Sequence, residues 1–383
     1  MQRSVNPQTS AQETPLARRL AGRIVAHGPL TFAEYMEACL YDPTHGYYSR
    51  PEATRFADYY TSVDVHPIFG RLLARQLAQM WDLLGKPWPF LAVEAGAGVG
   101  RLAAFILDFA AARLPDFYAA LRYAAVERTE ARRSAQAVAL SSHVASGHAE
   151  SRADLPEEIA EGCIVSNELF DAMPVHRVAR LHGELREYYV NCEAGGLVEE
   201  LRPFSSPAIQ DYFTRQGITL QEGQQAEAGL AACRWMQDAA RRLGRGFVLS
   251  VDYGHDAREL YSDRHMRGTV LAYRQHRANE DYYAAPGEQD LTAHVNFTAL
   301  ELWGREAGLE TAGRVSQSRF LLALGRANDF GDLYEAEQNE SERMRARQKL
   351  TALIHPEGMG ETFQVLIQQK GIAVGNLTGL EAL

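Results

Sequence analysis

The stretch Phe90-Leu91-Ala92-Val93-Glu94-Ala95-Gly96-Ala97-Gly98-Val99-Gly100 decides the fold, because it joins a short apolar segment to three closely spaced glycines. Residues 101–113 follow with the Ala, Leu and Phe content of a helix. A glycine-rich bend between a strand and a helix lets the backbone approach a ligand closely, since no Cβ intervenes. It also aims the helix N-terminus at a negative group of the ligand. The stretch therefore predicts a ligand site where the strand ends.

The spacing of the glycines separates the candidate cofactors. A dinucleotide fingerprint needs its third glycine three places after the second, and Arg101 occupies that position. No Lys-Ser/Thr pair follows the glycines, which excludes a Walker phosphate loop. Instead the third glycine is Gly100, and an acid, Glu94, closes the strand. This pattern resembles motif I of the methyltransferases, in which the acid interacts with the ammonium end of the methionine moiety of S-adenosylmethionine.

The segments around the bend alternate between strand and helix character, which predicts an α/β fold with a doubly wound, Rossmann-like sheet. An N-terminal helical segment and inserted hairpins and helices complete the prediction. We expect strands at 90–93, 123–126, 163–165 and 247–251, a late strand at 319–324, a weak strand near Val144 and hairpins within 177–201. We expect helices at 16–27, 67–84, 101–113, 130–140, 226–243, 297–308 and 329–353, and a capping box at Thr31-Phe32-Ala33-Glu34.

These elements suggest four parts. Residues 1–15 form a disordered tail and 16–85 an N-terminal helical cap. Residues 86–326 form the methyltransferase core with an insertion at about 177–225, and 327–383 form a C-terminal helical extension.

Composition limits the environment and the partners. The chain has 383 residues, 46% hydrophobic and 23% charged, as expected of a packed globular protein. A net charge of −10 argues against non-specific binding to nucleic acid, which needs clustered Lys and Arg. The four cysteines form no C-x-x-C pair, which predicts free thiols. No apolar run approaches the roughly 18 residues of a membrane span, and the polar N-terminus lacks a secretory signal. We expect a cytoplasmic protein, or a mitochondrial matrix protein if it is eukaryotic.

Acidic residues after the next strands provide further cofactor candidates. Glu127 ends the strand at 123–126, where a carboxylate can accept hydrogen bonds from both ribose hydroxyls. The alternative is an acid that only stabilises a helix N-terminus. Asp154 and Leu155 are candidates to flank the adenine, solely because of the resemblance to methyltransferases.

The segment from Ser166 to Pro174 is the predicted centre of the chemistry. It follows the strand at 163–165, and ligands of open α/β sheets gather at the carboxyl ends of the strands. Asn167, Glu168 and Asp171 are the catalytic candidates, because carboxylates can clamp a guanidinium bidentately. The alternative is an N-capped helix with acids in its first turn. Nothing in this pattern excludes lysine or a small amine as the methyl acceptor.

Metal chemistry and hydrolysis have little support in the sequence. The 12 histidines are scattered, with no H-E-x-x-H or Cys/His cluster, so we predict no metal. The G-x-S-x-G pattern of a serine hydrolase is also absent.

Taken together, the motifs resemble the MidA-like methyltransferases over nearly the whole chain, a family that includes the mitochondrial complex I assembly factor that methylates arginine. The resemblance rests on Tyr35 to Pro43 with Gly46-Tyr47-Tyr48, Asp58 with Thr61-Ser62, Glu94 to Gly100, Ser166 to Pro174, Asp252-Tyr253-Gly254-His255, Gly268-Thr269, Tyr273-Arg274-Gln275-His276, and Pro286 to Val295.

This resemblance implies an S-adenosylmethionine-dependent protein arginine methyltransferase whose client is a respiratory-complex subunit. Thr61, Ser62 and the glycine bend would line the cofactor, with Asn167 and Glu168 near its sulfonium. The substrate face would involve Asp252, Tyr253, Glu288 and Asp290, although these polar residues could equally hold loops together.

The sequence departs from the family pattern in two places. Thr61-Ser62-Val63-Asp64-Val65-His66 stands where the family usually has Thr-Ser-Pro-Glu-Ile-Ser, and Val99 stands where relatives often carry Arg. These changes put the expected substrate in doubt more than the expected cofactor.

Two other functions therefore stay open: an assembly chaperone that keeps the fold without catalysis, and a methyltransferase of small molecules. The sequence predicts neither the client, nor the methylation product, nor the oligomeric state.

Overall fold

A computed structural model of the protein describes residues 13–49, 62–194, 196–275, 277–334, 338–355, 359–373 and 376–382. The chain divides into two compact units, each with its own hydrophobic core. The hairpin unit comprises Met1–Tyr59, Phe170–Cys233 and His255–Ala299, and the large-sheet unit comprises Tyr60–Leu169, Arg234–Gly254 and Leu300–Leu383. Among the described residues, no helix combines the length and the apolar character needed to cross a bilayer.

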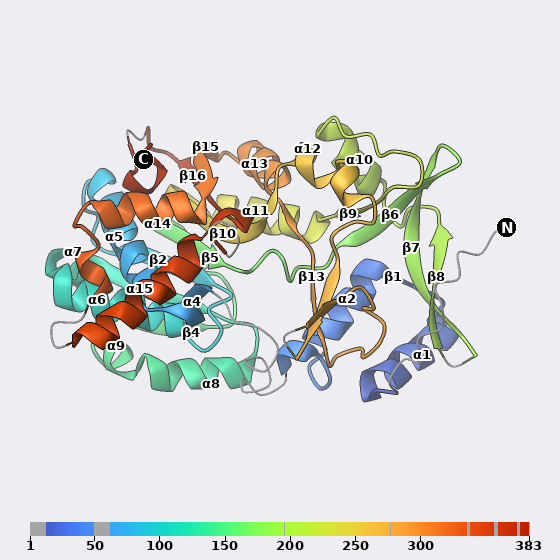
Figure 1. The fold of residues 1–383 in the computed structure, drawn as a ribbon, viewed down its shortest axis with the longest axis horizontal. Coiled ribbons are helices and arrows are strands. Elements are labelled where there is room, and N and C mark those ends of the chain that lie inside the picture. The colour runs from blue at the N-terminus through green and yellow to red at the C-terminus, as the bar shows by residue number, and fades with distance from the viewer. Residues whose placement is uncertain are drawn as a thin grey trace. The chain divides into compact units, whose positions relative to one another are not determined.

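A mixed sheet organises the large-sheet unit (Figure 1). Its strands lie in the order β15-β16-β10-β5-β2-β3-β4. The pairs β3/β4, β2/β3, β2/β5 and β5/β10 are parallel, whereas β16 runs antiparallel to both β10 and β15. The bounds are β2 Phe90–Ala95, β3 Leu121–Val126, β4 Ala149–Arg152, β5 Ile159–Asn167, β10 Leu243–His255, β15 Glu310–Ser316 and β16 Phe363–Lys370.

The register of the parallel strands aligns their carboxyl ends. Ala95 lies opposite Val126 of β3 and Ser166 of β5, and Asn167 of β5 lies opposite Val251 of β10. The residues that follow β2, β3 and β5 therefore emerge at one edge of the sheet, where ligands of such folds bind.

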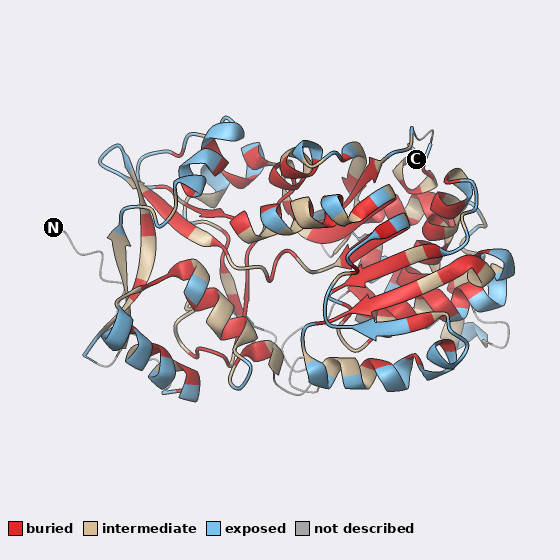
Figure 2. Cartoon of the chain, turned by 180° about the vertical axis from the view of Figure 1, so that it is seen from behind, coloured by how far each residue is buried: buried red, intermediate tan, exposed pale blue. Residues whose placement is uncertain are grey.

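Helices surround this sheet, and apolar side chains fill the space between them. The strands are largely buried, whereas the helices carry exposed outer surfaces (Figure 2). The core includes Phe69, Phe90, Ile106 and Phe247, none of them exposed. The helices are α4 Ser62–Val65, α5 Ile68–Leu83, α6 Arg101–Arg113, α7 Pro115–Ala120, α8 Glu130–Ala139, α9 Ser141–Ala145, α14 Gln317–Arg326, η3 Gly331–Leu333, α15 Glu340–Ile354 and η5 Thr378–Leu380. Two more, α11 Leu230–Arg242 and α13 Phe297–Glu306, run across the division between the units.

The hairpin unit contains two antiparallel sheets. One has the strand order β1-β7-β6-β9, with β8 added to β7, and the other has the order β12-β11-β13. The strands are β1 Leu30–Thr31, β6 His176–Leu181, β7 Glu184–Glu193, β8 Gly196–Arg202, β9 Gln225–Ala228, β11 Leu271–Arg274, β12 Arg277–Asn279 and β13 Asp290–Thr292. The short strand β14 Val295–Asn296 belongs to neither of these two sheets. The helices are α1 Pro15–His27, α2 Phe32–Tyr41, η1 Tyr47–Ser49, α10 Pro207–Arg215, α12 Ala257–Leu260 and η2 Asp263–His265.

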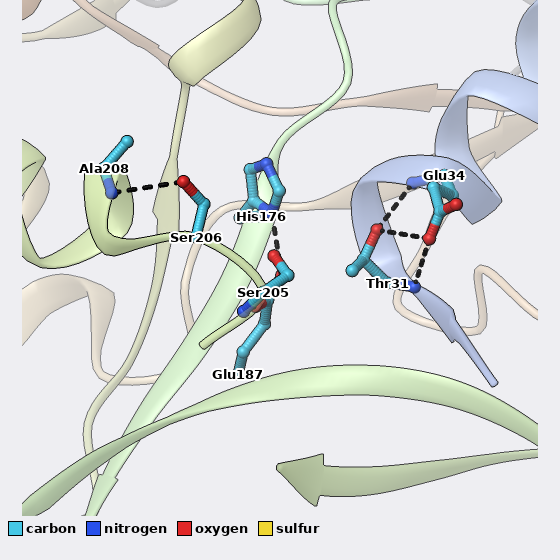
Figure 3. Close-up of polar contacts among 7 residues, drawn as sticks. All are labelled: Thr31, Glu34, His176, Glu187, Ser205, Ser206 and Ala208. Atoms are coloured by element: carbon cyan, nitrogen blue, oxygen red, sulfur yellow. Dashed lines mark hydrogen bonds and ion pairs between the residues drawn. The ribbon is translucent and has the colours of Figure 1, made fainter. Parts of the chain in front are cut away.

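Local polar contacts fix several of these elements (Figure 3). The predicted capping box is confirmed, because Glu34 N donates to Thr31 Oγ1 (3.1 Å) and Thr31 N donates to Glu34 Oε2 (2.9 Å).

A second polar cluster in the same unit joins Glu187, His176 and Ser205. The fully buried Glu187 carboxylate lies 2.7 Å from His176 Nδ1 and accepts from Ser205 Oγ at 3.1 Å. The carboxylate, rather than the imidazole, lies between the serine and the histidine. This trio therefore cannot work as a hydrolase triad, in which histidine must be central.

Two predictions about the later elements are wrong, and one earlier strand is displaced. Residues 319–324 form part of helix α14 and not a strand, because Ser316 caps the helix and Phe320, Leu321 and Leu324 bury one helical face. The weak strand expected near Val144 lies a few residues later, as β4, and Val144 itself belongs to helix α9. The predicted C-terminal extension is not purely helical, since β16 lies inside the main sheet, between β10 and β15.

Other boundaries also differ from the expected division. The helix expected at 226–243 begins at Leu230, because residues 225–228 form strand β9. Residues 62–85 group with the large sheet and residues 255–299 with the hairpins. Within the expected N-terminal tail, Thr14 caps helix α1 and Pro15 begins it; residues 1–12 lie outside the described residues.

Candidate functional site

The glycine bend leaves β2 in an unusual backbone conformation. Gly96, Gly98 and Gly100 have φ of +74°, +54° and +83°, and Gly100 is the N-cap of α6. Ala97 N donates to Val126 O at 2.9 Å, which ties the bend to the end of β3. The left-handed region is costly for residues with a Cβ, so glycine is the residue that fits here.

The three glycines serve different purposes. A Cβ on Gly96 would lie 2.9 Å from Leu169 Cδ1, and one on Gly100 would lie 3.2 Å from Gln136 Cγ. A Cβ on Gly98 would meet no atom of the described residues within 4 Å. Packing therefore explains the outer two glycines, whereas the backbone of Gly98 faces open space.

Glu127 holds its carboxylate against this open backbone. Its Oε2 accepts from Gly98 N at 3.1 Å and its Oε1 from Thr129 N at 2.9 Å, and the residue is 7% exposed. Gln136 secures the other side of the same residue, because its Nε2 donates to Gly98 O at 2.8 Å. The bend and the carboxylate that follows β3 thus form one hydrogen-bonded arrangement.

Glu94 is engaged within the protein. Its side chain is 4% exposed, and its Oε2 accepts from Tyr123 Oη on β3 at 2.8 Å. Burial raises the pKa of Glu94 to about 8, although the Tyr123 hydroxyl and the backbone of Ala103 act in the opposite direction.

Glu168 follows β5 in a strained conformation. Its φ is +51°, in the left-handed region, and its N–H donates to Val251 O at 2.9 Å. A non-glycine residue held there costs about 1–3 kcal/mol, and such residues are found at functional sites. Its Oε1 accepts from Ser62 N at 3.0 Å and from Asn167 Nδ2 at 3.2 Å. Two predicted catalytic residues and one predicted cofactor residue are therefore in direct contact.

Ser62 is held in place from the C-terminal part of the chain. It is fully buried, its Oγ donates to Gln317 Oε1 at 3.1 Å, and Gln317 Nε2 donates to Leu353 O at 3.0 Å. Sequence reasoning missed Gln317, because only the fold brings α14 to this position. Thr61, the other cofactor residue predicted in this segment, lies outside the described residues.

The altered segment after Ser62 has a structural explanation at two positions. Val63 joins the hydrophobic core of the large-sheet unit. His66 Nδ1 accepts from Ile68 N at 3.0 Å and so satisfies a donor at the start of α5.

The Asp252 side chain accepts hydrogen bonds from two backbone N–H groups. It is fully buried on β10, and its two oxygens accept from Leu169 N (3.0 Å) and Tyr253 N (2.9 Å). The ring of Tyr253 packs against Phe363, with centroids 5.4 Å apart. These contacts favour the loop-holding interpretation of Asp252 over direct substrate contact.

Three other predicted residues belong to the hairpin unit. Asp171 is buried, and its main-chain oxygen accepts from Ala293 N at 3.0 Å. Glu288 Oε2 accepts from Arg274 Nη2 at 3.2 Å, and Asp290 Oδ1 accepts from Tyr48 Oη at 3.1 Å. The large-sheet unit thus collects Ser62, Glu94, the bend, Glu127, Asn167 and Glu168, and these three residues are not part of that group.

The two residues predicted to flank the adenine are less buried than Glu94 and Glu127. Asp154 is exposed and Leu155 is half-buried, and Leu155 O accepts from Arg242 Nη1 at 3.3 Å. Both follow β4 at the edge of the sheet.

The fold and the bend define a class of protein that comparison confirms. Residues 72–315 match a family model described as "Putative S-adenosyl-L-methionine-dependent methyltransferase". Because this match covers more than half of the chain, the chain belongs to this methyltransferase family, and S-adenosylmethionine is its cofactor.

More specific similarities extend over nearly the full length. The chain is similar to a "likely methyl transferase" from Burkholderia thailandensis, crystallised with S-adenosyl-homocysteine, with 33% identity, a TM-score of 0.83, and 95% and 94% of the two chains covered. It is 28% identical to the Drosophila melanogaster homolog of the mitochondrial protein arginine methyltransferase NDUFAF7, over 94% of this chain and 86% of that protein. The Bos taurus NDUFAF7 protein is 29% identical, over 94% and 84%.

Proposed function

We propose that this protein methylates an arginine side chain of a protein client. The observation that carries the proposal is the placement of Glu168 at the carboxyl end of β5, where its backbone is strained and its carboxylate accepts from Ser62 and Asn167. The names of the Drosophila and bovine relatives, both protein arginine methyltransferases, support the same activity.

The residues at the bend fit the cofactor. The peptide at Gly98 offers backbone without a blocking Cβ, and Glu127 offers a carboxylate at the end of β3 for the ribose hydroxyls. Ser62, Gly96, Gly100, Asp154 and Leu155 would complete the lining. Because the Glu94 carboxyl is buried against Tyr123, we propose that Glu94 positions the bend rather than contacting the ammonium group directly.

When bound, S-adenosylmethionine supplies an electrophilic methyl group: an arginine nitrogen would attack the methyl carbon in line while the carbon–sulfur bond breaks, with S-adenosylhomocysteine as the neutral leaving group. The protein contributes mainly proximity and orientation, worth about 7–11 kcal/mol of the barrier in favourable cases. The Glu168 carboxylate would bind the guanidinium bidentately and hold the proton that the attacking nitrogen loses. Asn167, which donates to Glu168, would keep that carboxylate in position.

For the client side, Asp171, Tyr253, Glu288 and Asp290 stay predictions, and Asp252 is proposed as a loop support. The family resemblance suggests a respiratory-complex subunit as the client. The fly and bovine relatives are mitochondrial by name; for this protein we keep the prediction of a cytoplasmic location in a bacterium or a matrix location in a eukaryote.

Two variants separate cofactor binding from methyl transfer. Calorimetric titration with S-adenosylhomocysteine should show binding to the wild type and to Glu168→Gln alike. Glu127→Gln should weaken binding about 10- to 100-fold, since hydrogen bonds to a charged group contribute about 1.5–3 kcal/mol. An unchanged affinity of Glu127→Gln would argue against its ribose contact.

Mass spectrometry of proteins from cells with wild type, Glu168→Gln or no enzyme then tests the reaction. We expect methylarginine on a client only with the wild type. Without the Glu168 carboxylate the guanidinium would be poorly oriented, which should slow methyl transfer about 10²-fold. If Glu168→Gln restored client maturation fully without methylation, the protein would be an assembly scaffold. Methyl transfer only in protein-free extract would indicate a small-molecule substrate.

A further inference from the structure

Three histidines that are far apart in the sequence meet in the hairpin unit. His255 ends β10, His265 ends the turn η2, and His294 lies between β13 and β14. Their rings lie with centroids 5.3 Å apart for His255/His265 and for His255/His294, and 6.0 Å apart for His265/His294. One nitrogen from each ring can be chosen so that all three lie within 4.8 Å of one another.

We propose that His255, His265 and His294 bind one divalent transition-metal ion of the zinc class. Imidazole is a preferred ligand of such ions, and three histidines with a water in the fourth position make a standard tetrahedral zinc set. At Zn–N distances of about 2.0–2.1 Å, tetrahedral nitrogens lie roughly 3.4 Å apart. The rings therefore need to close by little more than 1 Å, which rotation of side chains can supply.

Glu259, on α12, lies beside two of the three rings. Its main-chain oxygen lies 3.1 Å from His265 Nδ1, which places the proton on Nδ1 and leaves the Nε2 lone pair for a metal. Its carboxylate Oε2 lies 3.6 Å from His255 Nδ1. Metal-binding histidines usually donate their second nitrogen to a carboxylate or carbonyl, and Glu259 provides both.

The third proposed ligand, His294, is held through its backbone. His294 N donates to Thr269 Oγ1 at 3.1 Å, which fixes the backbone of this ligand.

The bound ion would link three separate segments of the hairpin unit: the end of β10, the η2 turn and the loop before β14. A ligand that binds only the folded state stabilises it. The proposal is independent of the methyl-transfer chemistry, because all three histidines lie outside the group formed by the glycine bend, Glu127 and Glu168.

Calorimetry on tag-free, chelator-treated full-length protein tests this site with zinc sulfate as the probe. We expect one equivalent of zinc to bind the wild type and raise its melting temperature, and cobalt(II) to give the absorption of a tetrahedral ion. His265→Gln should lose that equivalent, whereas His27→Gln, an exposed histidine at the end of α1, should retain it. Glu259→Gln should weaken binding about 10- to 100-fold, as loss of outer-shell partners usually does.

Two results would overturn the proposal: no stoichiometric binding by the wild type at millimolar zinc, or equal binding by His265→Gln. If His265→Gln fails to fold, as judged by S-adenosylhomocysteine binding and circular dichroism, His255→Gln takes its place. Retention of the site in a folded His255→Gln would be equally contradictory.

Discussion

Two glycine turns of this molecule look alike locally and serve opposite purposes. Gly98 and Gly268 both have positive φ, +54° and +76°, and both lie beside a buried glutamate that accepts from the backbone. Glu127 accepts from Gly98 N at 3.1 Å, and Glu227 accepts from Thr269 N at 3.0 and 3.1 Å. A Cβ on Gly98 would meet none of the described atoms within 4 Å, but one on Gly268 would lie 2.1 Å from Glu227 Oε1.

The difference teaches how to interpret a glycine in a motif. At Gly268 the side chain of Glu227 already occupies the place of a Cβ, so the glycine serves internal packing. At Gly98 the space that a Cβ would enter is open, so a ligand can approach the backbone there. Both segments carry the family resemblance, and only the surroundings tell the two uses apart.

The largest expected effect is on cofactor binding by Gly98→Val. Its β-branched side chain would project into the open space at the bend, so we expect S-adenosylhomocysteine binding to fall by at least about 10²-fold, or roughly 2.7 kcal/mol. Isothermal titration measures it. Gly147→Val is the matched control, since Gly147 has φ of +76° and equally open surroundings outside the bend. Equal affinities for both variants would remove the distinction between the two turns.

Gly268→Ala should instead destabilise the fold. Overpacking against Glu227 and the positive φ together should lower the free energy of unfolding by about 2–4 kcal/mol, with cofactor affinity of the folded protein unchanged. Urea unfolding gives the first quantity and titration the second. Gly217→Ala isolates the backbone strain, because Gly217 has φ of +66° and no described atom near its Cβ position. The comparison fails if Gly268→Ala is no less stable than that control.

A third effect concerns the pH dependence of stability at Glu94. Its folded-state pKa, about 8, lies above the ordinary value of 4.5. Between these values the folded protein holds a proton that the unfolded chain has lost. The free energy of unfolding should therefore fall as pH rises through this window, by up to about 1.4 kcal/mol per unit, and level off above it.

Glu94→Gln should remove this contribution, because the amide does not titrate. Denaturant unfolding across the window compares this variant with the wild type and with Glu150→Gln, a change at an exposed carboxylate. Identical pH slopes in Glu94→Gln and wild type would show that the carboxyl is not the buried acid described above.

Local signals in the sequence were sufficient for much of the site. The strand before Gly96, the helix after Gly100, the acid at the end of β3 and the Asn167-Glu168 pair were all predicted, because each depends on residues that are neighbours in the chain. The prediction failed at residues 319–324, where one short apolar run fits a strand or a helix equally well. It also missed β16, whose partners β10 and β15 are distant in sequence.

By itself, the sequence determined the methyltransferase class, the position of the glycine bend and the acids that follow the strands, since spacing along one backbone fixes these features. Tertiary structure alone decided that Gly98 is open while Gly268 is packed, that Ser62 and Gln317 support Glu168, and that His255, His265 and His294 come together. The physical reason is that each of these depends on which distant segments occupy the space around a residue, and that is settled only when the sheets and helices pack.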